Sequence, residues 1–203
     1  MVPVHLDVAS PGFQGTSAAA GGHTRLFCTS SVPATGLGNE TFSPVVKPAT
    51  VRTVLVLALS RSWPIHQLDV KNAFLHGTLT ETVYCSQPTG YVDPTRLEMV
   101  GRLNKSLYGL KLAPRAWYSR FATFLVSLGF TEAKSDTSLF VYRCGDATAY
   151  LLLYVEDIPP VSTHFRPIGS LQQEFAMKDL GVLHHFLGVT AEPRPSGLFL
   201  HQR

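Results

Sequence analysis

This sequence of 203 residues has few charges and few cysteines, and both shortages restrict what it can be. Charged residues make up 15% and hydrophobic residues 45%, which is typical of a chain that folds around a core. The three cysteines, Cys28, Cys85 and Cys144, are too few and too scattered for a disulfide framework. None of them forms a Cys-x-x-Cys pair, so the sequence indicates no zinc site.

Long apolar runs are also missing. The longest, 54–59 and 149–155, fall far short of the roughly 20 residues that a membrane-spanning helix needs, so we expect no membrane association. Residues 1–38 contain one basic residue, Arg25, and lack the charged start and apolar stretch of a secretory signal. Ser, Thr, Ala, Gly and Pro dominate this segment, which predicts a loop or a weakly ordered tail.

The net charge of +3 says little about partners, but the charge is unevenly distributed. Residues 96–120 contain six basic residues and one acidic residue, a net charge of +5. Such a segment is typical of a surface that binds a polyanion, and it is equally typical of a solvated basic face. The basic residues are Arg96, Arg102, Lys105, Lys111, Arg115 and Arg120.

Helix and strand patterns alternate from residue 46 onward. Pro48 can begin a helix, and apolar residues recur from there at helical spacing to residue 60. After the Trp63-Pro64 break, residues 65–70 and 82–86 have the pattern of short strands.

The second half of the chain continues this alternation. Pro114 begins a second predicted helix with an apolar stripe that stops at Gly129. Two hairpins are predicted after it, over 138–155 and over 183–201.

Two acidic positions lie in or just after apolar strands. Asp69 lies in Leu68-Asp69-Val70, and Glu156-Asp157 follows an apolar run. Carboxylates beside an apolar core cost free energy unless they are paired or bind a cation. Acids on two adjacent strands fit a magnesium-dependent phosphoryl-transfer site. From spacing alone, however, turn-forming or surface acids are the commoner interpretation.

Three motifs occur in order along the chain. They are QLDVKNAFLHG at 67–77, SLYGLKLAPRAW at 106–117 and YVED at 154–157. Together they resemble the reverse transcriptase of copia-type retrotransposons, and flanking similarity extends the resemblance over about residues 39–203. The resemblance implies an α+β fold: a polymerase palm-like antiparallel sheet backed by helices, with incomplete fingers and no thumb. Residues 1–38 would be a divergent segment outside this partial domain.

The resemblance also implies a chemistry, RNA-directed DNA synthesis from a primer on an RNA or DNA template. Asp69, Glu156 and Asp157 would be the catalytic residues and would bind two Mg²⁺ ions that assist attack of the primer on a deoxynucleoside triphosphate. Association with other products of a retroelement polyprotein is expected. If the chain follows the family, it acts in a cytoplasmic virus-like particle or in the nucleus.

The same resemblance assigns four residues to the nucleotide and template. Phe74 would exclude a 2′-hydroxyl by its bulk, although without the resemblance it is an ordinary core aromatic. Tyr108 would stack or pack against a base, and Lys111 and Arg115 would neutralise phosphates.

Three departures from the family predict a truncated protein of low or no activity. Glu156 stands where the family has Asp, and the extra methylene moves the carboxylate by roughly 1 Å, which can cost about 100-fold in rate. Pro159-Pro160 predicts that the strand after Asp157 is shortened or lost. Residues 1–38 lack the basic residues of the family's fingers region.

Two alternatives remain open at this point. The chain is a non-catalytic remnant that binds nucleic acid through residues 96–120, or it forms no stable folded product because its catalytic hairpin is damaged.

Overall fold

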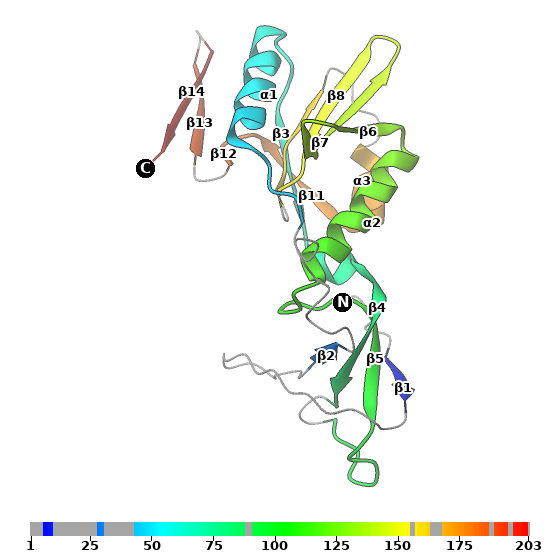
Figure 1. Cartoon of the computed structure of the whole chain (residues 1–203). Helices are drawn as coiled ribbons and strands as arrows, with labels where there is room; N and C mark the ends of the chain where they lie inside the picture. The colour runs from blue at the N-terminus through cyan, green and yellow to red at the C-terminus, as the bar shows by residue number, and fades with distance from the viewer. Residues whose placement is uncertain are drawn as a thin grey trace. The chain divides into compact units, whose positions relative to one another are not determined.

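The structure is a computed structural model, and it describes residues 6–9, 28–30, 43–87, 91–154, 157–162, 168–186, 189–194 and 197–202. Within these residues, helices and short antiparallel strands are mixed along the chain, which confirms the α+β class (Figure 1). The helices are α1 (Pro48–Ser60), α2 (Ala113–Ser127) and α3 (Ile168–Phe175). None of the described helices is long and apolar enough to cross a membrane.

The strands in the described part of the chain are mostly short. They are β1 (Leu6–Ala9), β2 (Cys28–Ser30), β3 (His66–Val70), β4 (Thr78–Ser86), β5 (Val100–Lys105), β6 (Phe130–Ala133), β7 (Asp136–Cys144), β8 (Ala147–Leu152), β9 (Asp157–Ile158), β10 (Pro160–Ser162), β11 (Met177–Val182), β12 (His185–Phe186), β13 (Val189–Arg194) and β14 (Gly197–Gln202).

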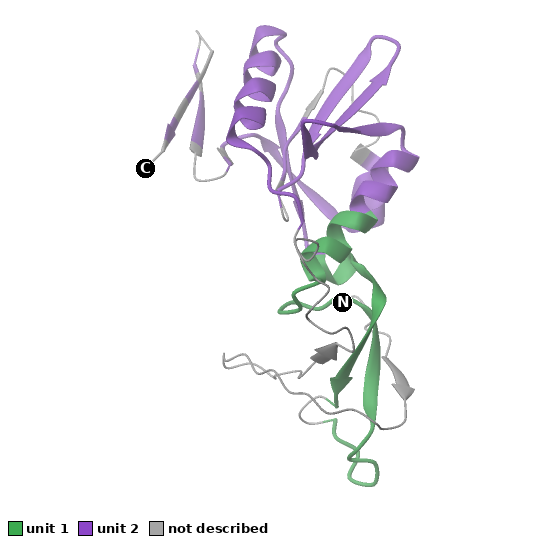
Figure 2. Ribbon diagram, viewed as in Figure 1, with its two compact units in different colours: residues 1–42, 74–120 green, residues 43–73, 121–203 purple. Residues whose placement is uncertain are grey.

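The chain divides into two compact units, shown in Figure 2. Residues 1–42 and 74–120 form unit 1, and residues 43–73 and 121–203 form unit 2. The described strands of unit 1 make one sheet, in the order β1-β5-β4-β2. Those of unit 2 make three sheets, in the orders β10-β8-β7-β6, β11-β3-β9 and β12-β13-β14. The single sheet expected from the sequence is therefore replaced by several small antiparallel ones.

In unit 2, the β7–β8 hairpin is covered on both faces. Because side chains alternate along a strand, Leu139 and Phe140 of β7 lie on opposite faces. Leu139 packs with the apolar stripe of α1, whereas Phe140 meets Phe121 edge to face at a ring distance of 6.4 Å. Phe121 also contacts Phe175 of α3 at 5.3 Å, so α2 and α3 cover the second face. The buried α1 residues are Val54, Leu55 and Ala58.

The first turn of α1 is fixed by a carboxylate from β7. Asp136 accepts hydrogen bonds from the Lys47 backbone N–H (2.9 Å) and from Thr50 Oγ1 (2.6 Å), and it also accepts one from the Ser138 N–H. Burial alone raises the pKa of Asp136, but these hydrogen bonds outweigh it and hold the pKa below its usual value. Asp136 thus supplies the helix cap that Lys47 cannot supply from its own side chain.

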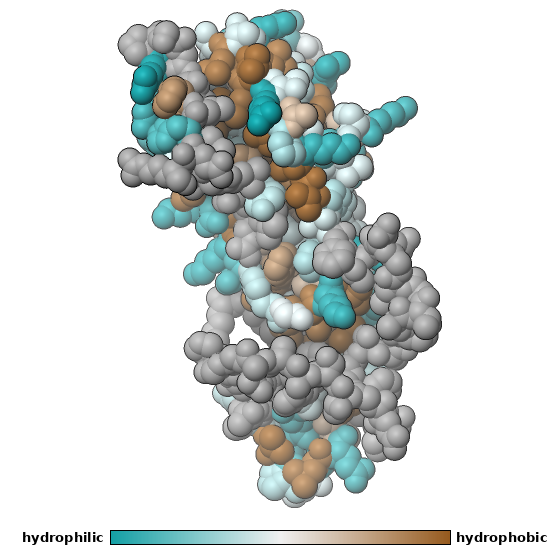
Figure 3. Space-filling view, turned by 60° about the vertical axis from the view of Figure 1, so that its left-hand side comes forward, coloured by the Kyte–Doolittle hydropathy of each residue, from teal (hydrophilic) through white to brown (hydrophobic). Residues whose placement is uncertain are grey.

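In unit 1, β4 and β5 carry a small apolar cluster. Val83, Cys85, Leu103 and Leu112 are its buried members. The connection between the two strands exposes apolar side chains instead, and Figure 3 shows this hydrophobic surface at the lower end of the view. The exposed residues there are Tyr91, Val92 and Leu97.

Two strands lie within the N-terminal segment that the sequence predicts as a loop or tail. β1 pairs with β5, and β2 pairs with β4, both antiparallel. β1 has four residues and β2 has three, which is too short for an alternating pattern to be visible in a sequence rich in small residues. Whether residues 1–38 as a whole are weakly ordered stays a prediction.

Candidate active site

The first candidate catalytic residue, Asp69, lies in the middle strand of a three-stranded sheet of unit 2. β3 begins after a tight exit from α1, in which the Trp63 N–H donates to the carbonyl of Ala58 and Pro64 prevents continuation of the helix. Leu68 is fully buried and anchors the strand in the core of unit 2. Asp69, the next residue along the strand, is half-buried.

The sheet register brings the second acidic position next to the first. β9 runs antiparallel to β3, and position 157 is directly opposite Asp69. Directly opposite positions in such a ladder share one face of the sheet, with Cβ atoms about 4.5–5.5 Å apart. Glu156, the third expected carboxylate, lies outside the described residues.

On its other side, Asp69 is paired with Lys178 of β11. Lys178 is exposed, and Asp69 lies between a basic residue at position 178 of one neighbouring strand and position 157 of the other. The sequence could not predict that Lys178 lies beside Asp69, because only the sheet register brings these two positions together.

The strand that carries Asp157 is short, as the Pro159-Pro160 pair predicts. β9 contains two residues and ends at Ile158, and the chain then changes sheets. Pro159 accepts a hydrogen bond from the Leu152 N–H, and β10 continues along β8 at the edge of its sheet. An edge position tolerates Pro160, which has no N–H to donate. The return strand is therefore divided between two sheets rather than lost.

Phe74 and Tyr108 belong to unit 1 and contact each other. Phe74 lies in a 3₁₀ helix, Ala73–His76, just after Asn72, which has a φ of 55°. The Phe74 and Tyr108 rings are 4.9 Å apart and tilted by 50°, and Tyr108 is half exposed. The two aromatic side chains that the resemblance assigns to the nucleotide are thus brought together, and about half of the surface of Tyr108 stays exposed.

The turn that carries Phe74 is tightly packed. Ser106 is fully buried, its hydroxyl donates to the carbonyl of Phe74, and its N–H donates to that of Gly77 at 3.0 Å. A Cβ added to Gly77 would lie 2.8 Å from the backbone N of Trp117 in α2. Only glycine allows this approach, so Gly77 and Ser106 together fix the position of the Phe74 turn.

The basic residues of 96–120 are not all available to a ligand. Arg120 donates from Nη1 to the carbonyl of His76 at 2.7 Å, and Arg115 lies 4.0 Å from a carboxylate oxygen of Glu81. Lys111 is exposed, as are Arg96 and Arg102. Part of the local positive charge is therefore used within unit 1, and the expected phosphate contacts of Arg115 compete with Glu81.

Asp69 and position 157 belong to unit 2, whereas Phe74, Tyr108, Lys111 and Arg115 belong to unit 1. Each group is ordered by its own unit. Among the described residues, no cluster of three or more His, Cys, Asp or Glu side chains could hold a metal ion.

Comparison with known proteins identifies the family. A family model described as reverse transcriptase (RNA-dependent DNA polymerase) matches residues 29–203. The chain belongs to this family. The match begins before the predicted boundary at residue 39 and takes in most of β2.

Relatives of this reverse transcriptase domain are copia- and Ty1-type retrotransposon Pol polyproteins. The chain is 51% identical over 169 residues to the retrovirus-related Pol polyprotein from transposon RE1 of Arabidopsis thaliana, covering 81% of the chain and 12% of the relative. It is 44% identical over 156 residues to the corresponding polyprotein from transposon TNT 1-94 of Nicotiana tabacum, covering 74% and 12%. No solved structure matches. The chain thus spans about an eighth of these plant relatives.

The residue types at positions 69 and 157 of this reverse transcriptase domain fit a divalent cation chemically. Like charges at directly opposite strand positions are destabilising. Carboxylate oxygens are the hard ligands that Mg²⁺ prefers. The pairing of positions 69 and 157 is therefore suited to the Mg²⁺ that the family implies.

Proposed function

We propose that this domain catalyses nucleotidyl transfer to a primer on an RNA or DNA template, with Asp69, Glu156 and Asp157 as metal ligands. The observation that supports this is the β3–β9 register, in which positions 69 and 157 are opposite each other. Mg²⁺ ions bound there would lower the pKa of the primer 3′-hydroxyl and neutralise charge on the leaving pyrophosphate.

The side chains of unit 1 would select and hold the deoxynucleotide. Phe74 would form a wall against a 2′-hydroxyl, and its contact with Tyr108 limits how far the ring can move. Lys111 is exposed and would neutralise phosphate charge, and Arg115 would do so once it leaves Glu81. The exposed part of Tyr108 would pack against a base.

We expect this activity to be low. Glu156 is one methylene longer than the family's Asp, and β9 gives Asp157 only two residues of strand support. A displacement of about 1 Å at a reacting centre can cost about 100-fold in rate.

Primer extension in Mg²⁺ tests the proposal. Glu156→Asp is expected to raise the rate by up to about 100-fold, because it restores the shorter carboxylate. Asp69→Asn is expected to abolish extension in both backgrounds. Asp146→Asn is the matched control, because Asp146 is an exposed carboxylate next to Gly145 in the β7–β8 turn. Extension by Asp69→Asn at the rate of Asp146→Asn would refute the assignment.

A second function is favoured by the exposed basic residues. If the chain is a non-catalytic remnant, Arg96, Arg102 and Lys111 would still bind primer–template. Binding would then survive Asp69→Asn, and log affinity would fall with log salt concentration by about 0.9 per duplex phosphate neutralised. Binding that does not depend on salt would exclude this function.

The partners follow from the same proposal. Primer–template and deoxynucleoside triphosphates would be the substrates. Because the chain spans 12% of the plant relatives, we also propose that it works in association with other parts of a Pol polyprotein.

A further inference from the structure

Phe74 is held in two ways by one short segment of unit 1, the residues that follow β5. The hydroxyl of Ser106 donates to the backbone carbonyl of Phe74, and the ring of Tyr108 lies 4.9 Å from the ring of Phe74. Backbone and ring are therefore both restrained. We propose that Ser106 is a positioning residue that keeps Phe74 in place, so that the site takes deoxynucleotides and rejects ribonucleotides; this inference rests on the proposed function.

The turn that carries Phe74 is tied to the rest of unit 1 by three hydrogen bonds. A short helix leaves its last carbonyls without partners inside the helix. Here the Phe74 carbonyl accepts from the Ser106 hydroxyl, and the Gly77 carbonyl accepts from the Ser106 N–H at 3.0 Å. The third bond joins Nη1 of Arg120 to the His76 carbonyl at 2.7 Å. Ser106 thus makes two of the three bonds, and its hydroxyl alone reaches the residue that bears the ring.

The Ser106 hydroxyl lies where water cannot replace it. Ser106 is 0% exposed. Without the hydroxyl, the Phe74 carbonyl keeps the bond from the Gly77 N–H at 3.0 Å, but that bond is internal to the turn and moves with it. Because hydrogen bonds away from water restrain their partners more strongly, loss of this hydroxyl should loosen the turn without exposing the core.

A side chain can exclude a 2′-hydroxyl only if it does not move aside. A shift of about 1 Å at a reacting centre can change a rate by about 100-fold, so a small displacement of Phe74 is enough to admit a ribonucleotide. A residue that only stabilises unit 1 would lower the use of both nucleotides alike. A positioning residue instead changes the ratio between them, and that ratio is the quantity to measure.

Ser138 is the matched control. It lies in β7 of unit 2 and is also 0% exposed, but its hydroxyl has no hydrogen-bond partner among the described residues. Replacement by Ala removes the same atom from the same degree of burial at both serines. The difference between the two variants therefore reports the bond to Phe74.

The test compares dATP with ATP, which differ by the 2′-hydroxyl alone. Binding of each nucleotide to the full chain in Mg²⁺ is measured by isothermal titration calorimetry, and primer extension on a poly(dT) template is measured with each. We expect the wild type to prefer dATP. Ser106→Ala is expected to lower this preference about tenfold, the equivalent of one hydrogen bond, through better use of ATP. Ser138→Ala should leave the preference unchanged.

A second variant covers the case in which Ser106→Ala folds poorly. Arg120→Ala removes the bond to the His76 carbonyl of the same turn, so it should also lower the preference for dATP. If Arg120 instead neutralised phosphate charge, its loss would weaken binding of dATP and ATP by the same factor, and the ratio would stay constant.

Three results would overturn the inference: a wild type without preference for dATP, an unchanged ratio in both variants, or an equal change in Ser138→Ala. The failure of the proposed function has a different signature. A chain that extends no primer, but binds dATP in preference to ATP in a manner that depends on Ser106, would refute catalysis and support the positioning role.

Discussion

The first turns of α1, in unit 2, and of α2, in unit 1, are packed by different means. In unit 2, α1 begins at a buried carboxylate, Asp136, which accepts hydrogen bonds from Lys47 and Thr50. In unit 1, the first turns of α2 lie so close to Gly77 that a methyl group would collide with the backbone of Trp117. The first arrangement depends on the charge of a carboxylate, and the second on the absence of a side chain at Gly77. A change of pH should therefore affect unit 2, and an added methyl group should affect unit 1.

This difference bears on the proposed site. The chain passes from unit 2 to unit 1 between Ala73 and Phe74, four residues after Asp69. Positions 69 and 157 are therefore held by a sheet of unit 2, and the aromatic pair by the packing of unit 1. If the proposed function is correct, damage to unit 2 should alter metal binding, and damage to unit 1 should alter nucleotide selection.

The largest expected effect is in the core of unit 2. Phe121→Ala removes a fully buried ring that contacts both Phe140 and Phe175, and should cost about 3–5 kcal/mol in urea unfolding. Phe199→Ala is the matched control, because Phe199 is 46% exposed. Hydrogen exchange should show lost protection in β7 and α3. Equal losses for the two variants would mean that Phe121 does not organise the core.

The next effect tests whether charge holds α1. Asp136→Asn should cost about 2–3 kcal/mol at pH 7, because an amide cannot accept all the hydrogen bonds that the carboxylate accepts. The pKa of Asp136 is lower in the folded state, so its contribution is complete above the unfolded value of about 3.9 and is lost as the pH falls through the folded value. The unfolding free energies of the two proteins should therefore approach each other as the pH falls through the folded pKa of Asp136.

Asp146→Asn provides the control for this pH series. Asp146 is an exposed carboxylate. Its replacement should leave the pH dependence of the wild type in place. A gap between wild type and Asp136→Asn that is constant from pH 2 to pH 8 would contradict a role for charge at α1.

In unit 1 the matching perturbation is steric. Gly77→Ala should cost about 1–2 kcal/mol, because the new methyl group must displace either Ser106 or the backbone of α2. The cost should be the same at pH 4 and pH 8. Gly169→Ala in α3 is the control, since a methyl group there meets nothing within 4 Å and should stabilise the helix by up to about 1 kcal/mol. If both variants behave alike in urea unfolding, space at Gly77 is not limiting.

Local patterns were sufficient for much of this fold. Pro48, the Trp63-Pro64 break and Gly129 mark element ends in the sequence, and the structure confirms the predicted helices at α1 and α2. Gly129 has a φ of 93°, which only a residue without Cβ adopts easily and which ends the helix as expected.

Long-range pairing could not be predicted in the same way. Lys47 has no side chain that could cap α1, which weakly indicates that a residue elsewhere caps the helix, but no local pattern identifies Asp136 as that residue. In the same way, only the sheet register puts Lys178 opposite Asp69 and Cys28 opposite Cys85. The sequence motifs predicted Asp69 and Asp157 as site residues, and the structure puts their positions opposite each other. Their catalytic role stays a prediction.

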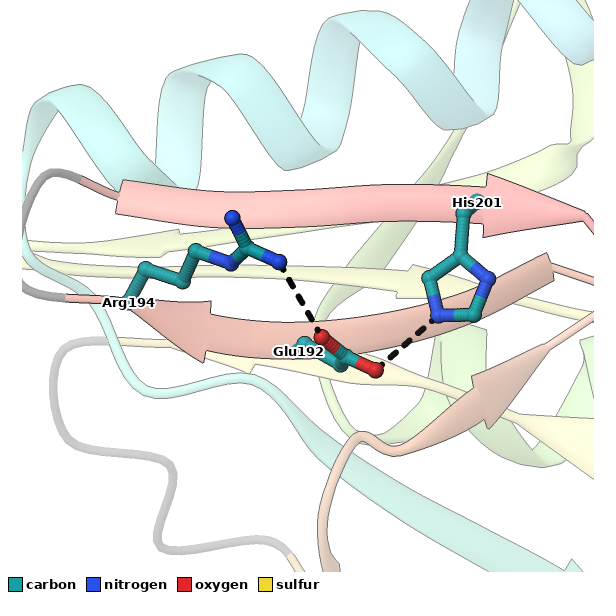
Figure 4. A network of polar contacts seen from close by, with 3 residues as sticks. All are labelled: Glu192, Arg194 and His201. Atoms are coloured by element: carbon teal, nitrogen blue, oxygen red, sulfur yellow. Dashed lines mark hydrogen bonds and ion pairs between the residues drawn. The ribbon is translucent and has the colours of Figure 1, made fainter.

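The smallest expected effect lies on the hairpin β13–β14 of unit 2, where Figure 4 shows a second carboxylate with two partners. Glu192 Oε1 lies 3.0 Å from His201 Nε2, and Oε2 lies 3.5 Å from Arg194 Nη2. The hydrogen bond with His201 lowers the pKa of Glu192, with a smaller contribution from Arg194. Unlike Asp136, however, Glu192 is exposed, so water and salt screen its charge. Glu192→Gln should therefore leave the urea midpoint unchanged at pH 5 and pH 8, with or without added salt. A loss comparable to that of Asp136→Asn would show that hydrogen-bond number, rather than burial, determines what a carboxylate contributes in this protein.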